Sequence, residues 1–491
     1  MLKKLSYACN PYLPGKEHVP DGEPHVFGDR LYMFGSHDEI GADRYCTGSY
    51  VGWSAPVNDL GDWRYEGVIL KKGQDPYDPD GTKDYYAPDA AQGPDGRYYL
   101  YYSIEGSMVI SVAVCEEPAG SYQFYGHVKD SKGHVIGSEE GDDYQFDPAV
   151  LVDDDGKIYL YSGQGLPIPE VNGRKVRGSM VCELERDMLT NKGEQRTVTS
   201  NTENIFQENR FFEASSIRKY DGKYYFIYSP LPNTHFLCYA MSDYPDRDFA
   251  YAGVLVSNAD IFTGDPKRQE PMNYWGNNHG SLLRLGEEFY IFYHRNSNKT
   301  PYARQGCAER IFRDKDGRFS QAELTSNGLY QGAHRSVCPS GGRTSSDKVY
   351  TQAFPMKGEY AAYIAWRLQK KDMDPFVPFQ FLQYGEDDPY ITEEEGTEIP
   401  YIANLRDGAK AGYRYLSSDG TESSFFVKAR GTGNGEIVVT GNEKELTRIP
   451  VKAKEEWTEF EAPCHGEGDR VSLCLTYQGE GAVDLLSLGM R

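Results

Sequence analysis

One hydrophobic pattern recurs five times in the first two-thirds of the chain. In residues 25–36 a short apolar run is followed by a turn that contains glycine and then by an aromatic-rich run. The other four copies cover residues 91–103, 150–162, 217–229 and 282–294. Such a turn between two β-prone runs predicts a β-hairpin, because Gly and Asp tolerate the positive φ that a tight turn requires.

The spacing of these hairpins predicts the fold. The turn glycines of the five copies are Gly28, Gly96, Gly156, Gly222 and Gly286. A hairpin every ~65 residues leaves room for two further strands, which is typical of a β-propeller with four-stranded blades. A β-sandwich is the alternative, but sandwiches do not repeat one hairpin at this period. We therefore predict an all-β chain in which residues 1–335 form a five-bladed β-propeller.

The last third of the chain has a different pattern. Polar and apolar residues alternate in or near period two over residues 425–430, 435–440, 457–461 and 471–477. Turn residues separate these runs, so we predict a β-sandwich of the jelly-roll type over residues 348–491. The segment Arg335–Asp347 is rich in Ser and Gly and is the predicted linker.

Length and composition agree with two β-domains. They also limit the kinds of molecule that the protein can bind. A chain of 491 residues exceeds the ~250–300 residues at which single cores stop growing. The 39 Tyr, 22 Phe and 5 Trp suit β-structure and flat surfaces for stacking. The net charge of −22 argues against nucleic acid and anionic membranes as partners. A small neutral oligosaccharide fits these limits, whereas the composition does not indicate an oligomeric state.

The cysteines and the first residues bear on location. The nine cysteines are scattered without a CxxC pair, which predicts reduced thiols. No apolar stretch of a signal peptide follows Met1–Cys9, and no run approaches the ~20 apolar residues of a membrane span. We therefore expect a cytoplasmic protein, although a cleaved leader missing from the sequence would leave the same start.

Three acidic residues stand immediately before hairpins. Asp21 precedes the first hairpin, Asp147 the third and Glu213 the fourth. Equivalent positions of successive blades converge on a propeller axis, so these carboxylates are candidates for one shared cleft; chance placement is the alternative. Glycoside hydrolysis requires one carboxylic acid with a raised pKa and one carboxylate that activates water. A third negative charge nearby would raise the pKa of the acid.

These elements together resemble glycoside hydrolase family 43 over roughly residues 8–330. Besides the three acids, Tyr86–Asp89 resembles the family's Trp-Ala-Pro-Asp/Glu element, and Asn278–Ser281 resembles its Gly-His-Gly-Ser element. The chain departs from the family pattern at two places. Gly22 follows the first acid where proline is common, and Ala214 follows the third where glycine is common.

The resemblance implies a role for each acid. Asp21 would be the general base, Asp147 would tune and orient the acid, and Glu213 would be the general acid. The family inverts the anomeric configuration, which implies ~6.5–9.5 Å between acid and base. It requires no cofactor for the chemistry.

Four further residues have two open interpretations each. His279 resembles a histidine that lies beside a calcium ion in the channel of many members, or it packs in the axis with local hydrogen bonds. Asp89 either lines the cleft or hydrogen-bonds a loop, and Trp275 either stacks on sugar or fills a blade interface. Arg304 either reaches the cleft as a donor to an acid or forms a surface pair.

The tail, residues 411–491, resembles a family 6 carbohydrate-binding module. Its Trp457 is either a structural aromatic or a ligand platform, and we favour a module that packs against the propeller. The whole pattern predicts an exo-acting hydrolase that removes terminal α-L-arabinofuranosyl residues from plant-wall oligosaccharides. A β-D-xylosidase, a β-D-galactofuranosidase and a non-catalytic sugar-binding propeller are the alternatives.

Overall fold

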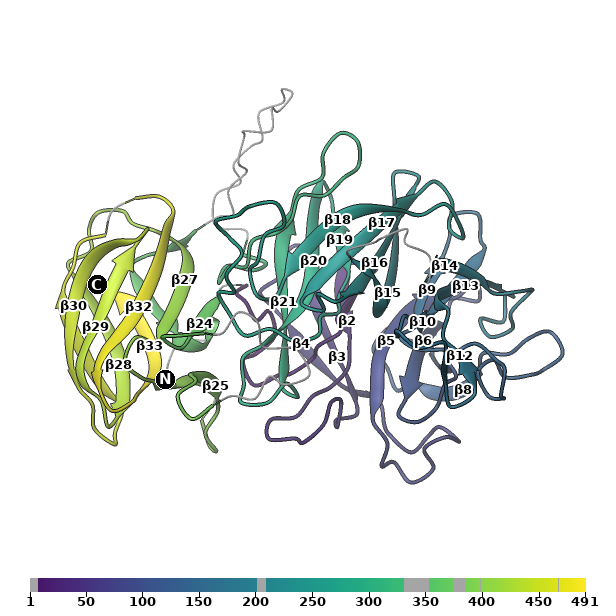
Figure 1. Cartoon of the computed structure of the whole chain (residues 1–491), viewed down its shortest axis with the longest axis horizontal. Coiled ribbons are helices and arrows are strands. Elements are labelled where there is room, and N and C mark those ends of the chain that lie inside the picture. Colours follow the sequence, from purple (N-terminus) through teal and green to yellow (C-terminus); the bar gives the residue numbers. More distant parts are fainter. Residues whose placement is uncertain (1–7, 201–208, 331–352, 374–384, 398, 467) are drawn as a thin grey trace.

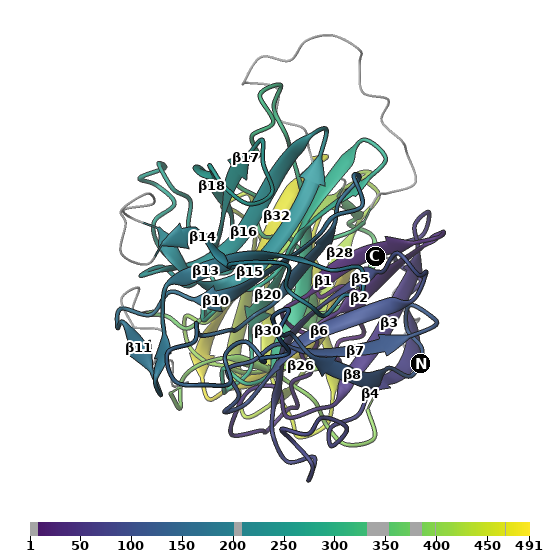
Figure 2. The same cartoon turned by 90° about the vertical axis from the view of Figure 1, so that its right-hand side faces the viewer.

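The computed structural model describes residues 8–200, 209–330, 353–373, 385–397, 399–466 and 468–491. The predicted linker lies outside these residues. A propeller half and a sandwich half lie side by side in Figure 1, and Figure 2 shows the molecule from the propeller end with the sandwich behind. Among the described residues no helix is long and apolar enough to cross a membrane. The 3₁₀ helix η2 covers Ala362–Ile364.

Five antiparallel sheets follow one another along the chain and form the blades. The first two blades contain β1 (Glu23–Phe27), β2 (Arg30–Phe34), β3 (Tyr50–Pro56), β4 (Arg64–Leu70), β5 (Tyr85–Gln92), β6 (Tyr98–Ile104), β7 (Ser111–Cys115) and β8 (Gln123–His127). The third contains β9 (Ala149–Val152), β10 (Ile158–Gln164), β13 (Gly178–Leu184) and β14 (Arg196–Ser200). The last two contain β15 (Arg210–Tyr220), β16 (Lys223–Leu231), β17 (Phe236–Ser242), β18 (Ala250–Ser257), β19 (Leu282–Leu285), β20 (Glu288–Asn296) and β21 (Arg304–Ile311). A separate small hairpin pairs β11 (Glu170–Val171) with β12 (Arg174–Lys175).

The predicted hairpins are the first two strands of the five blades, so the five-bladed propeller is confirmed. Each sheet runs in chain order, and the inner strands meet around the axis: β1 contacts β5 and β19, and β9 contacts β5 and β15. The ring closes through the start of the chain. The amide N–H of Tyr12 donates to the Gly306 carbonyl at 3.2 Å, and the Asn10 side chain donates to the Ala308 carbonyl at 3.0 Å, both along β21.

The many tyrosines fill the blades and the spaces between them. Many of their rings are fully buried, and several of their hydroxyls donate to backbone carbonyls. The Tyr101 hydroxyl donates to the Met188 carbonyl at 2.6 Å, and the Tyr50 hydroxyl donates to the Tyr86 carbonyl at 2.8 Å. Tyrosine therefore supplies both apolar area and hydrogen bonds where the flat faces of neighbouring blades pack together.

The rest of the described chain forms two six-stranded sheets. One contains β22 (Phe354–Pro355), β24 (Arg367–Gln369), β27 (Lys410–Ser417), β29 (Asn434–Gly441), β30 (Lys444–Lys452) and β32 (Val471–Glu480). The other contains β23 (Gly358–Ala361), β25 (Tyr390–Thr392), β26 (Tyr401–Leu405), β28 (Ser424–Gly431), β31 (Thr458–Pro463) and β33 (Val483–Met490). Apolar residues of both sheets share one core, as the period-two pattern predicted.

Two buried arginines join the halves. Arg295 of β20 donates to the carbonyls of Ala365 and Tyr363 at 2.8 Å each. Arg414 of β27 donates to Asp260 at 2.8 Å, and its guanidinium carbon lies 3.5 Å from the centre of the Trp366 ring. Because buried guanidinium groups with satisfied donors fix geometry on both sides, the sandwich is held firmly on the propeller.

Candidate active site

The three predicted acids line one cavity of about 430 Å³. Asp21 lies just before β1, Asp147 just before β9, and Glu213 within β15, so three different blades supply them. Asp21 and Asp147 are buried, and Glu213 is partly buried. His279 and Arg304 line the same cavity. The expected convergence at the axis is therefore observed, across sequence separations of more than sixty residues.

The backbone around the cavity departs from regular strand geometry. Asp21, Asp147 and Ala214 have φ of 58°, 45° and 66°, and Ala87 has φ of 29°. The register of β15 against β16 shifts on both sides of Glu213. Positive φ is costly for residues other than glycine, and register shifts re-aim side chains, so both features mark a site where geometry is imposed by the surroundings. Ala214 adopts a backbone conformation that glycine would adopt without strain.

Asp21 lies against a buried arginine and a buried histidine. Arg304 Nη1 donates to Asp21 Oδ1 at 2.9 Å, and His294 Nδ1 lies 3.3 Å from the same oxygen. Burial raises the pKa of Asp21, but the Arg304 guanidinium and His294 outweigh it and hold the pKa well below its usual range. Asp21 is therefore ionised at neutral pH, which suits a general base.

Glu213 has the opposite surroundings. Burial and the nearby Asp147 carboxylate raise the pKa of Glu213 to about 8, although Gln164 donates to its Oε2 at 2.9 Å and lowers it somewhat. A carboxylic acid that keeps its proton at neutral pH suits a general acid. Two carboxyl groups in one cavity thus have pKa values displaced in opposite directions.

The pKa of Asp147 lies between those of Asp21 and Glu213. Its Oδ2 accepts a hydrogen bond from the Ala214 amide at 2.9 Å, so it fixes the backbone next to Glu213. Burial raises the pKa of Asp147 to about 6, with His279 acting against burial and Asp21 acting with it. This position suits a residue that orients the acid and raises its pKa.

Arg304 is buried and held from two sides. Its Nε and Nη2 donate to the two oxygens of Asp38 at 2.8 Å and 3.0 Å, while Nη1 donates to Asp21. The surface-pair interpretation of Arg304 is wrong, since both of its acidic partners are buried. The fork-like pairing with Asp38 fixes the guanidinium plane and leaves one nitrogen for the base.

His279 lies deeper in the axis. Its Nδ1 is 3.9 Å from Asp147 Oδ2, and its Nε2 is 3.8 Å from Oε1 of Glu23, whose other oxygen binds Arg218. Burial lowers the pKa of His279, but the Glu23, Asp147 and Asp21 carboxylates raise it to about 9. Within the described residues, His279 Nε2 and Glu23 Oε1 are buried without hydrogen-bond partners.

These two facing atoms fit a bound ion or water. Calcium prefers six to eight oxygen ligands, so Glu23 would hold it only together with several waters, and His279 would contact it only in its neutral form. A separate cluster of Glu23, His25 and Asp89 also has its ligand atoms within 4.8 Å of one another. Calcium in the channel stays a prediction, and the acid and base residues described above need no cofactor.

Asp89 and Trp275 do not line the cavity. Asp89 is fully buried, with Oδ1 2.7 Å from His25 Nε2 and Oδ2 accepting from the Val150 amide at 2.8 Å. It therefore ties together the inner strands of three blades. Trp275 is also buried. In this structure neither side chain is placed to contact substrate, because both are buried away from the cavity lining and Asp89 is also hydrogen-bonded within the protein.

Several lining residues were not predicted. The wall contains five aromatic side chains: Tyr45, Tyr86, Tyr144, Phe146 and Phe212. Asp38, Gln164 and His294, which hold Arg304, Glu213 and Asp21, were also missed. A signal existed, because each of these three ends or closely follows the aromatic-rich strand of a predicted hairpin.

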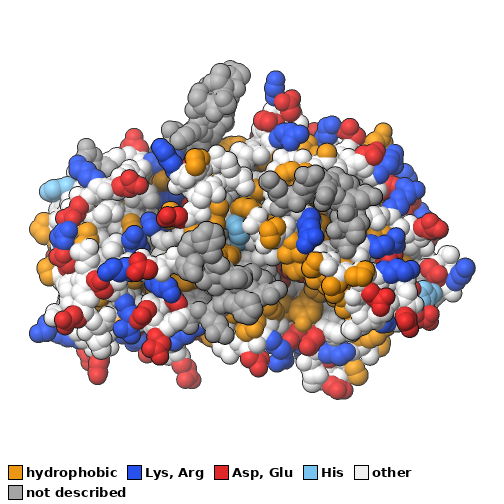
Figure 3. Space-filling model, in the orientation of Figure 1, with side chains coloured by type: hydrophobic (Ala, Val, Ile, Leu, Met, Phe, Trp, Pro, Cys, Tyr) orange, Lys and Arg blue, Asp and Glu red, His pale blue; other side chains and the backbone are white. Residues whose placement is uncertain are grey.

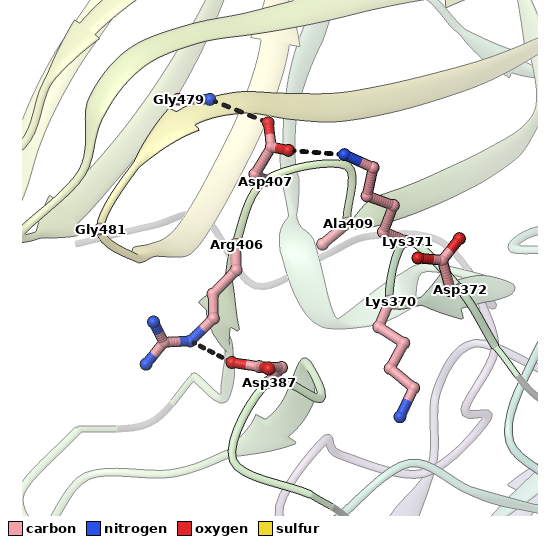
Figure 4. A pocket seen from close by; sticks show the side chains of 9 residues that line it. All are labelled: Lys370, Lys371, Asp372, Asp387, Arg406, Asp407, Ala409, Gly479 and Gly481. Carbon is pink, nitrogen blue, oxygen red and sulfur yellow. Dashed lines mark hydrogen bonds and ion pairs between the residues drawn. The ribbon is translucent and has the colours of Figure 1, made fainter.

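The sandwich has a cavity of its own, of about 530 Å³, shown in Figure 4. Its charged side chains form pairs: Lys371 lies 2.9 Å from Asp407, and Arg406 lies 3.4 Å from Asp387. No aromatic residue is among the described residues that line it. Charges of both signs are interspersed over the face of the sandwich in Figure 3, whereas hydrophobic side chains gather on the propeller half.

Trp457 lies elsewhere on the sandwich. Its ring is 5.3 Å from that of Tyr401, and the Arg430 guanidinium carbon lies 4.4 Å from the centre of the indole. Arg430 in turn pairs with Glu394 at 3.0 Å. A ring face that is already covered by a guanidinium group suits the structural interpretation of Trp457.

Comparison with known proteins gives one family. The family model described as glycosyl hydrolases family 43 matches residues 10–319. A xylosidase/arabinosidase from Thermoclostridium stercorarium is 42% identical, over 97% of this chain and 98% of its own length.

Two solved structures are similar in fold. A family 43 arabinoxylan arabinofuranohydrolase from Bacillus subtilis, in complex with cellotetraose, covers 99% of this chain and 98% of its own, with a TM-score of 0.51 at 18% identity. This likeness concerns the fold alone. A family 43 β-xylosidase/α-arabinofuranosidase from a compost microbial metagenome, in complex with xylotriose and in a calcium-free form, covers 65% of this chain and 98% of its own, with a TM-score of 0.51 at 25% identity.

Proposed function

Because the chain belongs to glycoside hydrolase family 43, we propose that it removes terminal α-L-arabinofuranosyl residues from plant-wall-derived oligosaccharides with inversion at the anomeric carbon. The observation that carries this proposal is the meeting of Asp21, Asp147 and Glu213 in one cavity, where Arg304 binds Asp21. Glu213 is protonated at neutral pH, with a pKa of about 8, and Asp21 is ionised. Inverting hydrolysis needs this combination of one acid and one base.

The steps follow from these proton states. Glu213 donates its proton to the glycosidic oxygen as the bond to the anomeric carbon breaks, and the aglycone leaves as an alcohol. Asp21 accepts a proton from a water molecule whose oxygen forms the new bond on the opposite face of the sugar. Asp147 orients Glu213 through the Ala214 amide, and Arg304 keeps Asp21 ionised.

The shape and lining of the cavity support a short substrate. A volume of about 430 Å³ is at the lower end of the range for small-molecule sites and suits one or two sugar rings better than a long polymer segment. The five aromatic side chains in its wall offer flat faces for sugar rings. Exo-action on oligosaccharides fits both features.

A β-D-xyloside is the second candidate substrate. The relative at 42% identity is named for both activities, and the two pentoses have a similar outline. A non-catalytic sugar-binding propeller would need neither a protonated Glu213 nor a separately charged Asp21, so the site argues against that alternative.

We also propose that the sandwich packs against the propeller and does not bind sugar. The buried arginines across the interface, the covered Trp457 and a cavity lined by paired charges support this role. The location in the cytoplasm and a β-D-galactofuranoside substrate stay predictions.

The test is a panel of nitrophenyl glycosides. We expect the wild-type protein to release nitrophenol fastest from the α-L-arabinofuranoside, more slowly from the β-D-xyloside and least from the β-D-galactofuranoside. A faster rate on the β-D-xyloside would replace the main substrate by the second candidate. Binding of xylotriose without hydrolysis of any of the three glycosides, or of xylotriose itself, would support the non-catalytic alternative.

A further inference from the structure

We propose that strand β25 of the sandwich braces the wall of the active site through the loop of residues 297–303, and that Asn298 is the positioning residue of this brace. The loop connects β20 to β21, and β21 begins with Arg304. The effect on substrate rests on the proposed function of the cavity, whereas the brace itself is a property of the fold.

The first part of the loop is bound to β25. The Ile391 amide donates to the Ser297 carbonyl at 2.7 Å, and Asn298 Nδ2 donates to the Ile391 carbonyl at 2.8 Å. Both backbone groups of Ile391 are thus used by two consecutive loop residues. Asn298 is 8% exposed, and the Lys299 ammonium lies 4.3 Å from the centre of the Tyr390 ring. Buried hydrogen bonds of this kind leave a costly unpaired group when one partner is removed.

The last part of the loop contacts the cavity wall. The Tyr302 ring packs edge-on against the Tyr45 ring, with centroids 4.7 Å apart. The Arg304 guanidinium carbon lies 4.7 Å from the centre of the same Tyr45 ring, and the Arg304 amide donates to Asp38 at 2.9 Å. Tyr45 and Arg304 both line the cavity. A few residues of loop therefore connect the sandwich to the wall beside the base Asp21.

Loops are ordinarily the least stable parts of a fold, and binding sites are often built on them because a rigid neighbour positions them. Here that neighbour is a strand of the other half of the molecule. Without the bonds to Ile391, the loop would be free to move Tyr302 away from Tyr45. The ring of Tyr45 would then lose a packing partner, and the wall would no longer fit the sugar closely.

The interface offers a matched control. Gln369 Nε2 donates to the Pro271 carbonyl at 2.6 Å and is buried to a similar extent as Asn298. Replacing either amide side chain by alanine removes one hydrogen bond from the sandwich–propeller interface. Gln369, however, contacts neither the loop of residues 297–303 nor a cavity-lining residue in the interactions described. The two variants therefore separate loss of interface stability from loss of the brace.

Hydrogen exchange tests the brace without reference to activity. In Asn298→Ala we expect faster amide exchange over residues 297–303 and over residues 43–47, which contain Tyr45. In Gln369→Ala both segments should exchange as in the wild type. Unchanged exchange over residues 43–47 in Asn298→Ala, or an equal increase in both variants, would overturn the proposal.

Kinetics test the consequence for substrate. Loss of one buried hydrogen bond predicts a KM for the cleaved nitrophenyl glycoside that is about three- to tenfold higher in Asn298→Ala, with kcat within about twofold of the wild type. Gln369→Ala should leave KM unchanged. An unchanged KM in Asn298→Ala would show that the brace does not reach the substrate.

A double variant shows whether Asn298 acts through Tyr302. If it does, Asn298→Ala combined with Tyr302→Ala should raise KM no further than Tyr302→Ala alone. Fully additive effects would contradict the proposed route. A wild-type protein that cleaves no glycoside would refute the proposed function, whereas the exchange experiment would still decide whether the brace exists.

Discussion

The propeller and the sandwich each have a cavity lined by several carboxylates, and the two differ in how these charges are paired. In the sandwich, Asp407 and Asp387 lie within 3.4 Å of Lys371 and Arg406, and all four side chains are well exposed. In the described part of the propeller cavity, Glu213 forms no ion pair, and Asp147 has only His279, at 3.9 Å. Similar residue types thus give a solvated surface in one half and a reactive site in the other.

The comparison shows that the pKa of a buried carboxyl group rises when no cation lies beside it. Exposed pairs contribute little to stability and keep both partners charged. In the propeller, Arg304 binds Asp21, so Asp21 stays ionised while the Glu213 carboxyl keeps its proton. The position of Arg304 decides which acid becomes base and which remains acid.

The two cavities should differ most when one carboxylic acid in each is replaced by its amide. Glu213→Gln should lower kcat/KM by about 10²- to 10⁴-fold, because no proton is available for the leaving oxygen. The loss should be greater on xylotriose, or on an arabinofuranosyl oligosaccharide, than on nitrophenyl glycosides, whose leaving group needs less protonation. Asp407→Asn, the matched change in the sandwich, should leave both rates as in the wild type. Equal losses in the two variants would contradict the comparison.

A smaller effect is expected when the arginine of each cavity is removed. Arg304→Met should lower kcat/KM by about tenfold or more at neutral pH, because burial then raises the pKa of Asp21 and part of the base is protonated. The acidic limb of the pH profile should move to higher pH, and part of the activity should recover as the pH rises toward about 8, where Glu213 begins to lose its proton. Arg406→Met is the control and should leave the profile unchanged. An unmoved acidic limb in Arg304→Met would show that Arg304 does not tune the base.

The pH dependence itself sharpens the assignment of the acid. Activity needs protonated Glu213, so kcat/KM should fall as the pH rises through about 8. In Asp147→Asn the negative charge beside Glu213 is gone, so the pKa of Glu213 should fall and the alkaline limb should move to lower pH. The measurement is kcat/KM against pH for both proteins. An alkaline limb that stays in place would remove Asp147 from its tuning role.

The smallest effect is expected in the sandwich cavity. Lys371→Met breaks the pair with Asp407, whose side chains are 63% and 54% exposed. Ion pairs this exposed contribute little to stability, so the midpoint of unfolding should stay as in the wild type. Chemical denaturation of the full chain measures this. A clearly lowered midpoint would mean that the pair does more than cover a solvated surface.

The sequence predicted the blades because their signal is local. Each hairpin carries its turn glycine and its aromatic-rich strand within a dozen residues, so the period was visible without any tertiary information. The acids were found for the same reason, since each stands at a fixed place relative to a hairpin. Asp89 stayed open between the cleft and a structural hydrogen bond, because the sequence does not show that His25 and the Val150 amide occupy its oxygens.

The partners of the site were beyond local reasoning. Asp38 meets Arg304 across 266 positions of sequence, and Ile391 meets Asn298 across 93. Such contacts depend on how the blades close and on how the sandwich docks, which no short pattern encodes. The charge state of each acid follows from those distant partners and therefore became clear only in the folded structure.

The central claim is that Glu213 keeps its proton at neutral pH while Asp21 does not. Difference infrared spectroscopy of wild type against Glu213→Gln measures this directly, through the C=O stretch of the protonated carboxylic acid. The account predicts that the band assigned to Glu213 persists at pH 7 and disappears as the pH is raised through about 8. A Glu213 band that is already lost at pH 5, where an ordinary glutamate is ionised, would contradict it.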